Sequence, residues 1–175
     1  EVLPDALKHR FCGVHFFNPP RYMHLLELIG TPDTDPAVLD TIETFATSTL
    51  GKGVVRAKDT PNFIANRVGT AGMLATVIEA DKASLTYDVV DDLTGKRLGR
   101  APSGTFRTID VVGLDTVAHV IGTLHSNLNL QTDSFYDSYA TPGVFHELLE
   151  RKNFGQKSGA GFYKKVGRDI LRFDH

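Results

Sequence analysis

Three polar residues have the type and setting that proton chemistry requires: His15, Glu27 and Asn66. His15 lies near the end of an apolar run that stops at Asn18-Pro19, and the carboxyl ends of parallel strands are where ligands bind in open α/β sheets. By itself a histidine in an apolar run is more often a satisfied core residue. The residues around His15 must therefore decide between the two interpretations.

Glu27 favours the catalytic interpretation of His15. Residues 23–29 are predicted to form a strand whose alternation places Glu27 between Leu25 and Ile29 on one face. A carboxylate between aliphatic side chains is costly to bury unless it is paired, and an imidazole on the adjacent strand would pair with it. Such a carboxylate fixes the tautomer of the ring and makes its other nitrogen a better base. The alternative, with Glu27 in solvent and His24 against the core, fits the pattern equally well.

Asn66 follows the segment Thr60-Pro61, which is predicted to cap a long helix. An amide in the second turn of that helix could donate a hydrogen bond to a substrate oxygen. The alternative is a surface asparagine beside Arg67.

Other kinds of site are not indicated. The histidines outside the first third occur singly, so we expect no metal site. Cys12 is interpreted as a small buried apolar residue. The 175 residues contain neither G-x-G-x-x-G nor G-x-x-x-x-G-K-[ST], so no cofactor-binding residue is predicted on this chain.

The elements that must position these residues change in kind along the chain. Strands are predicted at 11–17, 23–29 and 54–57, with a helix between the last two that Asp35-Pro36 begins and Gly51 closes. Helices are predicted at 62–85, after Thr86, from Thr108, at 114–128 and at 142–151, before a small hairpin at 162–171. We therefore expect a mainly α chain, with a partial α/β domain at residues 1–58 and an all-helical domain at residues 59–175.

The composition and net charge of the chain limit the kinds of partner it is expected to bind. Hydrophobic residues make up 41% of the chain, which is enough for a core, and a net charge of -2 offers no basic field for nucleic acid. The single cysteine forms no internal disulfide, and no apolar run approaches the ~20 residues of a membrane span. No signal-peptide pattern opens the chain, so we expect a cytoplasmic protein without a membrane span.

Four sequence blocks, in order, span nearly the whole chain. GVHFFNPPRYM at 13–23 followed by LLELI at 25–29 resembles the signature of 3-hydroxyacyl-CoA dehydrogenases, roughly G-x-H-F-F-N-P, then M, then L-x-E-[VI]-I. DTPNFIANR at 59–67 resembles the family block D-x-P-G-F-x-x-N-R, with Asn62 in place of the usual glycine. GLD at 113–115 and GQKSGAGFY at 155–163 resemble its later blocks.

The resemblance implies a fold, a reaction and roles. It implies the last strands of a Rossmann-type NAD domain followed by a helical domain, and oxidation of (3S)-3-hydroxyacyl-CoA to 3-oxoacyl-CoA with NAD in fatty-acid β-oxidation. In that family His15 would be the base that removes the proton of the 3-hydroxyl group. Glu27 would orient the imidazole, and Asn66 would contact substrate and histidine.

Where the sequence departs from the family pattern, the resemblance implies that it is part of a longer protein. The NAD-binding loop and a family serine that contacts the substrate hydroxyl are not in this sequence, so we expect the isolated chain to be inactive. Residues 100–107 differ from the commoner G-x-P-M-G-P-F and resemble a branch of long multifunctional enzymes, in which an enoyl-CoA hydratase-like domain is fused to the dehydrogenase. We expect a homodimer through the helical domain. The alternative function is a non-catalytic helical module for dimerisation and acyl-CoA binding.

Overall fold

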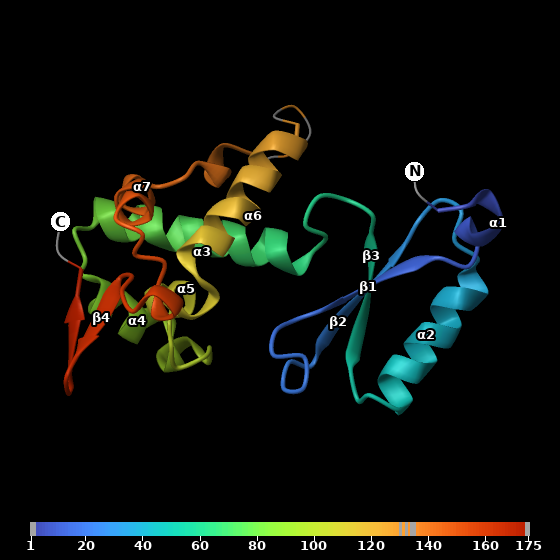
Figure 1. Cartoon of the computed structure of the whole chain (residues 1–175), viewed down its shortest axis with the longest axis horizontal. Coiled ribbons are helices and arrows are strands. Elements are labelled where there is room, and N and C mark those ends of the chain that lie inside the picture. Colours follow the sequence, from blue (N-terminus) through green and yellow to red (C-terminus); the bar gives the residue numbers. More distant parts are fainter. Residues whose placement is uncertain (1–2, 130, 132, 134–135, 174–175) are drawn as a thin grey trace. The chain divides into compact units, whose positions relative to one another are not determined.

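The computed structural model describes residues 3–129, 131, 133 and 136–173, and the chain separates into two units, Glu1–Ala65 and Asn66–His175. Figure 1 shows that strands dominate the first unit and helices the second. The mainly α chain with a partial α/β part that the sequence predicts is confirmed.

The first unit is a three-stranded sheet with one long helix beside it. A short helix α1 (Asp5–Lys8) precedes β1 (Cys12–Phe16), β2 (Leu25–Gly30), α2 (Pro36–Ser48) and β3 (Gly53–Lys58). The strand order is β1-β2-β3, with β1 antiparallel and β3 parallel to β2. His15 therefore does not lie at the carboxyl end of a parallel strand, because β1 reaches β2 through a short reversal rather than through a helical crossover.

The central strand β2 is buried on both faces. Leu26 and Leu28 pack with Ala46 of α2, which covers that face of the sheet. Helix α2 begins where it was predicted, since the Asp35 side chain accepts a hydrogen bond from the Ala37 amide and a proline occupies the first helical position. The other face of β2 carries Glu27, which is also buried.

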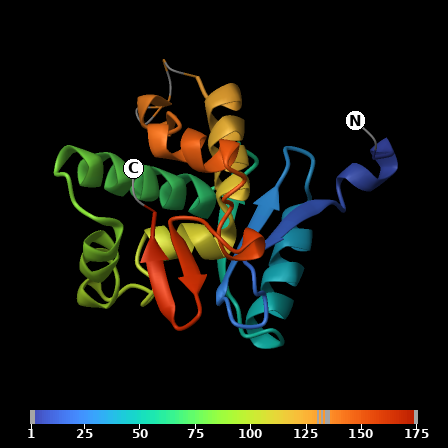
Figure 2. The same cartoon turned by 60° about the vertical axis from the view of Figure 1, so that its left-hand side comes forward.

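The second unit is a helical domain with a C-terminal hairpin. Its helices are α3 (Ala65–Lys82), α4 (Tyr87–Thr94), α5 (Phe106–Val112), α6 (Leu114–Asn127) and α7 (Gly143–Glu150), with short 3-10 turns at Lys96–Leu98, Tyr136–Tyr139 and Gln156–Ser158. Strands β4 (Tyr163–Val166) and β5 (Asp169–Arg172) form the antiparallel hairpin that Figure 2 shows near the C-terminus. The hairpin was predicted from its two apolar pairs.

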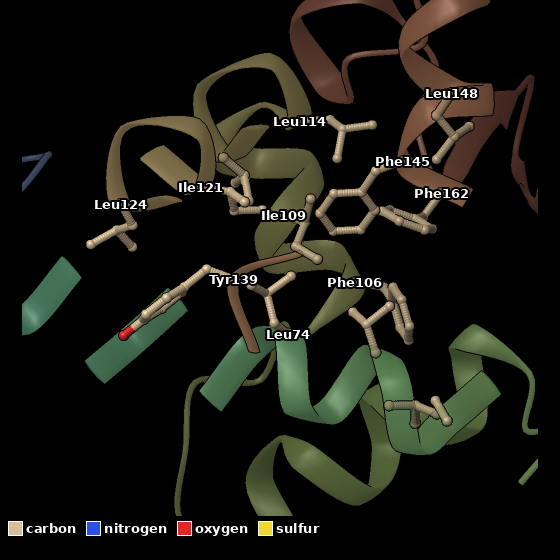
Figure 3. Close-up of a cluster of buried hydrophobic side chains, with 14 residues drawn as sticks. Leu74, Phe106, Ile109, Leu114, Ile121, Leu124, Tyr139, Phe145, Leu148 and Phe162 are labelled. Carbon is tan, nitrogen blue, oxygen red and sulfur yellow. The ribbon is translucent and has the colours of Figure 1, made fainter. Parts of the chain in front are cut away.

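The core of the second unit gathers apolar side chains from every helix. Figure 3 shows Phe106, Phe145 and Phe162 grouped near Ile109 and Leu148. The Phe106 and Phe162 ring centroids lie 4.8 Å apart in a tilted arrangement. Each fully buried side chain of this size contributes about 1.5–3 kcal/mol, so this cluster is the main source of stability of the domain.

Two predicted helix starts are wrong. Helix α3 begins at Ala65 rather than Asn62, since Asn62 and Phe63 have φ angles of 58° and 52° that no right-handed helix accommodates. Helix α5 begins at Phe106 rather than near Thr108. The cap of α5 comes from a distant residue: the Asp91 carboxylate accepts from the Phe106 amide at 2.6 Å.

The block at residues 155–163 is held by buried carboxylates. Asp110 accepts from the amides of Phe162 and Tyr163, both at 2.9 Å, and the Tyr163 hydroxyl donates to Asp91 at 2.8 Å. A Cβ atom at Gly161 would overlap the Asp110 carboxylate, which explains a glycine at that position. This block is therefore structural.

Candidate active site

His15 and Glu27 form a cross-strand pair. They lie directly opposite each other in the register of β1 and β2. His15 Nδ1 and Glu27 Oε2 are 2.8 Å apart, and the two side chains are 30% and 1% exposed. The pairing expected from strand alternation is present. The alternative with Glu27 in solvent and His24 in the core is wrong: His24 is exposed, and its Nδ1 accepts from the Gly53 amide at 2.7 Å.

The remaining partners of Glu27 determine which nitrogen of His15 carries a proton. Glu27 Oε1 accepts from the backbone amides of Ile64 at 3.0 Å and Ala65 at 2.7 Å. An ionised carboxylate has only acceptors to offer, and here it meets three N–H groups. The ring proton of a neutral His15 therefore lies on Nδ1, and Nε2 carries the lone pair. The partly exposed imidazole can thus accept a proton at Nε2.

Two aromatic rings contact the imidazole of His15. The Phe17 centroid lies 4.6 Å from the imidazole centroid, with an interplanar angle of 56°. The Phe63 centroid lies at 5.5 Å with an interplanar angle of 55°. Sequence reasoning missed Phe17 and Phe63 as parts of the site, although both lie inside the two blocks that carry the family resemblance.

Asn66 is half-buried and is the second residue of α3. It belongs to the second unit, directly after Ala65, whose amide binds Glu27. The structure brings His15 and Glu27 together, and the role of Asn66 stays a prediction. Its neighbour Arg67 forms an ion pair with the buried Asp133.

Among residues 3–65, the turn between β2 and α2 does not resemble a glycine-rich phosphate-binding loop. The turn from β2 into α2 is residues 31–35, without glycine, and Thr34 Oγ1 donates to the Phe11 carbonyl at 2.7 Å. The N-terminus of α2 already holds the Asp35 carboxylate, which would repel a pyrophosphate. This turn therefore does not fit the pyrophosphate of a dinucleotide, and we derive no step through NAD here.

The described residues show neither a metal site nor a membrane-spanning helix. In residues 3–129, 131, 133 and 136–173, no cluster of three His, Cys, Asp or Glu side chains could hold a metal ion. Within the same residues, every helix is too short or too polar to span a bilayer. The Cys12 thiol is half-buried in the sheet core, where burial raises its pKa.

Two family models match the chain, one in each half of the sequence. The family model described as "3-hydroxyacyl-CoA dehydrogenase, NAD binding domain" matches residues 5–60, and the one described as "3-hydroxyacyl-CoA dehydrogenase, C-terminal domain" matches residues 63–165. The chain belongs to the 3-hydroxyacyl-CoA dehydrogenase family. The resemblance seen in the sequence is confirmed, and His15 and Glu27 lie in the segment that matches the NAD-binding domain of this dehydrogenase family.

Relatives of the dehydrogenase family extend well beyond the length of this chain. A probable 3-hydroxyacyl-CoA dehydrogenase of Bacillus subtilis is 47% identical over 97% of the chain, which spans 21% of that protein. A putative fatty acid oxidation complex trifunctional enzyme of Rickettsia prowazekii is 36% identical over 93% of the chain, which spans 22% of it. The crystal structure of M. tuberculosis FadB2 matches with a TM-score of 0.79 and 32% identity, over 90% of the chain and 53% of FadB2. The chain therefore corresponds to part of these proteins.

Proposed function

We propose that this chain is the histidine-bearing part of an NAD-dependent enzyme that oxidises (3S)-3-hydroxyacyl-CoA to 3-oxoacyl-CoA in fatty-acid β-oxidation. The observation that carries the proposal is the His15–Glu27 pair, with Nδ1 held by a buried carboxylate and Nε2 left as the acceptor. Membership of the dehydrogenase family and the name of the Bacillus relative support the substrate class.

In this proposal the side chains of the chain move one proton. His15 Nε2 accepts the proton of the substrate 3-hydroxyl group, and the imidazolium that forms is stabilised by Glu27 at 2.8 Å. The amides of Ile64 and Ala65 also donate to the Glu27 carboxylate and hold it in position. The amide of Asn66 is assigned to a substrate oxygen. NAD, the oxidant of the family, is assigned to residues outside this sequence.

We assign residues 1–58 to the end of an NAD-binding domain and residues 59–175 to the helical domain of a longer, cytoplasmic protein. The trifunctional relative supports fusion to further activities, including an enoyl-CoA hydratase-like domain. Exposed apolar side chains on the helices, among them Val68 and Val111, support a homodimer formed by the helical domain. No specific observation favours the alternative of a non-catalytic module.

The test is His15→Ala in the longer enzyme that contains this sequence, assayed by NADH formation from a 3-hydroxyacyl-CoA. Loss of the base lowers kcat by ~10²-fold or more. His9→Ala is the matched control, because His9 is an exposed histidine of the same unit. Turnover close to that of the His9 variant would refute the role of His15. The isolated 175-residue chain is expected to form no NADH.

A further inference from the structure

Phe63 is unusual in both its backbone and its surroundings. Asn62 and Phe63 follow each other with φ angles of 58° and 52°, in the left-handed region. Asparagine tolerates this conformation, but a bulky aromatic residue is rarely found there. Backbone strain of this kind persists only where the surrounding contacts hold it, and it concentrates at functional sites.

Several contacts of this turn involve Glu27 and His15. The Phe63 amide donates to the Thr60 carbonyl at 3.0 Å and closes the turn. The next two amides, of Ile64 and Ala65, donate to the same carboxylate oxygen of Glu27. The left-handed pair thus directs two amides to the carboxylate while the Phe63 ring contacts the imidazole.

The imidazole of His15 is held by three contacts, one hydrogen bond and two aromatic ring contacts. Its Nδ1 is bound to Glu27, and the rings of Phe17 and Phe63 contact it at 4.6 and 5.5 Å. The hydrogen bond alone leaves the ring free to tilt about the Nδ1–Oε2 line. The aromatic contacts restrict that tilt and so fix the direction of the Nε2 lone pair.

We propose that Phe63 is a positioning residue for His15: the strained turn holds its ring against the imidazole, so that Nε2 keeps one direction and Nδ1 keeps its bond to Glu27. The inference rests on the proposed role of His15 as the base, and deepens it. The substrate class does not enter the argument, because every contact used lies within the first unit.

The decisive measurement is the tautomer of His15 in this chain, read by nitrogen NMR with labelled histidine. Phe63→Leu removes the ring and keeps an apolar side chain, whereas Phe63→Tyr keeps the ring. Phe45→Leu is the control, since Phe45 is 51% exposed and lies on α2. We expect wild type, F63Y and F45L to show one Nδ1–H tautomer with a slowly exchanging proton. F63L is expected to lose that slow proton and to average the two nitrogen shifts.

An unchanged His15 tautomer and exchange rate in folded F63L overturns the proposal, whatever the kinetics. If F63L does not fold, Phe63→Met replaces it, because methionine keeps the volume without a ring. In the longer enzyme, F63L is expected to lower kcat about tenfold with KM within about twofold, and F63Y to restore kcat, as for a misplaced base. Full turnover by His15→Ala would reject the proposed function, yet the tautomer measurement would still decide the role of Phe63.

Discussion

Two different replacements of Glu27 distinguish its two roles, which are to accept from the amides at the start of α3 and to orient the imidazole of His15. In Glu27→Ala, three donors lose their acceptor: His15 Nδ1 and the amides of Ile64 and Ala65. A donor left unsatisfied in a buried place costs about 1–3 kcal/mol, and removing a buried carboxylate gives back part of its desolvation cost. Since Glu27 is 1% exposed, we expect Glu27→Ala to destabilise the first unit by about 3 kcal/mol.

Glu27→Gln keeps one oxygen for the two backbone amides but presents an NH2 group to His15. His15 Nδ1 must then accept, so the ring proton moves to Nε2. All three hydrogen bonds are still formed, but their acceptor or donor is now a neutral amide rather than a carboxylate. We therefore expect the free energy of unfolding to fall by about 1 kcal/mol. Because Nε2 now carries the proton in the neutral ring, the longer enzyme should lose ~10²-fold or more in kcat.

Three measurements test this separation. Hydrogen exchange of the β2 amides reports the stability of the first unit by itself, which matters because two units need not unfold together. Nitrogen NMR reports the tautomer of His15, and NADH formation by the longer enzyme reports turnover. A Glu27→Gln chain that retains the Nδ1–H tautomer, or is as unstable as Glu27→Ala, would refute the reasoning.

Further predictions concern the second unit. In Gly161→Ala the added methyl group overlaps the Asp110 carboxylate, so we expect the free energy of unfolding in urea to fall by at least about 2 kcal/mol. Gly122 lies in open space on α6, so Gly122→Ala should raise that free energy by about 0.5–1 kcal/mol. Equal effects of the two substitutions would contradict this account. Burial raises the pKa of Asp110 above 3.8, only partly opposed by its two amide donors. The folded state therefore binds this proton more tightly than the unfolded chain, and stability relative to Asp110→Asn should fall as pH rises from 3.8 and level off above the raised pKa. Urea titrations across that range with a flat difference would disprove this. Sedimentation of the chain should show a dimer, and a strict monomer at high concentration would reject it.

Local patterns predicted the parts of the fold that rest on local physics. The order of strands and helices followed from hydrophobic period, Asp35-Pro36 and Gly51. Strand alternation and the cost of an unpaired buried carboxylate made a contact between His15 and Glu27 one of two equal interpretations, and the register of β1 and β2 decides between them. The catalytic roles came from the family resemblance and stay predictions.

The features that the sequence did not reveal depend on distant partners. The start of α5 is capped by Asp91, 15 residues earlier, where the local rule pointed to a threonine. The left-handed turn at Asn62 and Phe63 had only a weak local signal, an asparagine where the family block has glycine, and nothing local indicated that Phe63 would share this conformation. The backbone donors to Glu27 could not be foreseen for the same reason.

The bond from Asp110 to Phe162 closes a segment of 52 residues, and this has a consequence for synthesis on the ribosome. Helix α5 is made long before its partner strand, so the carboxylate of Asp110 has no amide donors while the chain grows. Burial of a carboxylate without donors is costly, so we expect α5 to pack stably only after those donors have been made. We therefore expect the apolar side chains beside Asp110 to stay more exposed until Tyr163 has been synthesised.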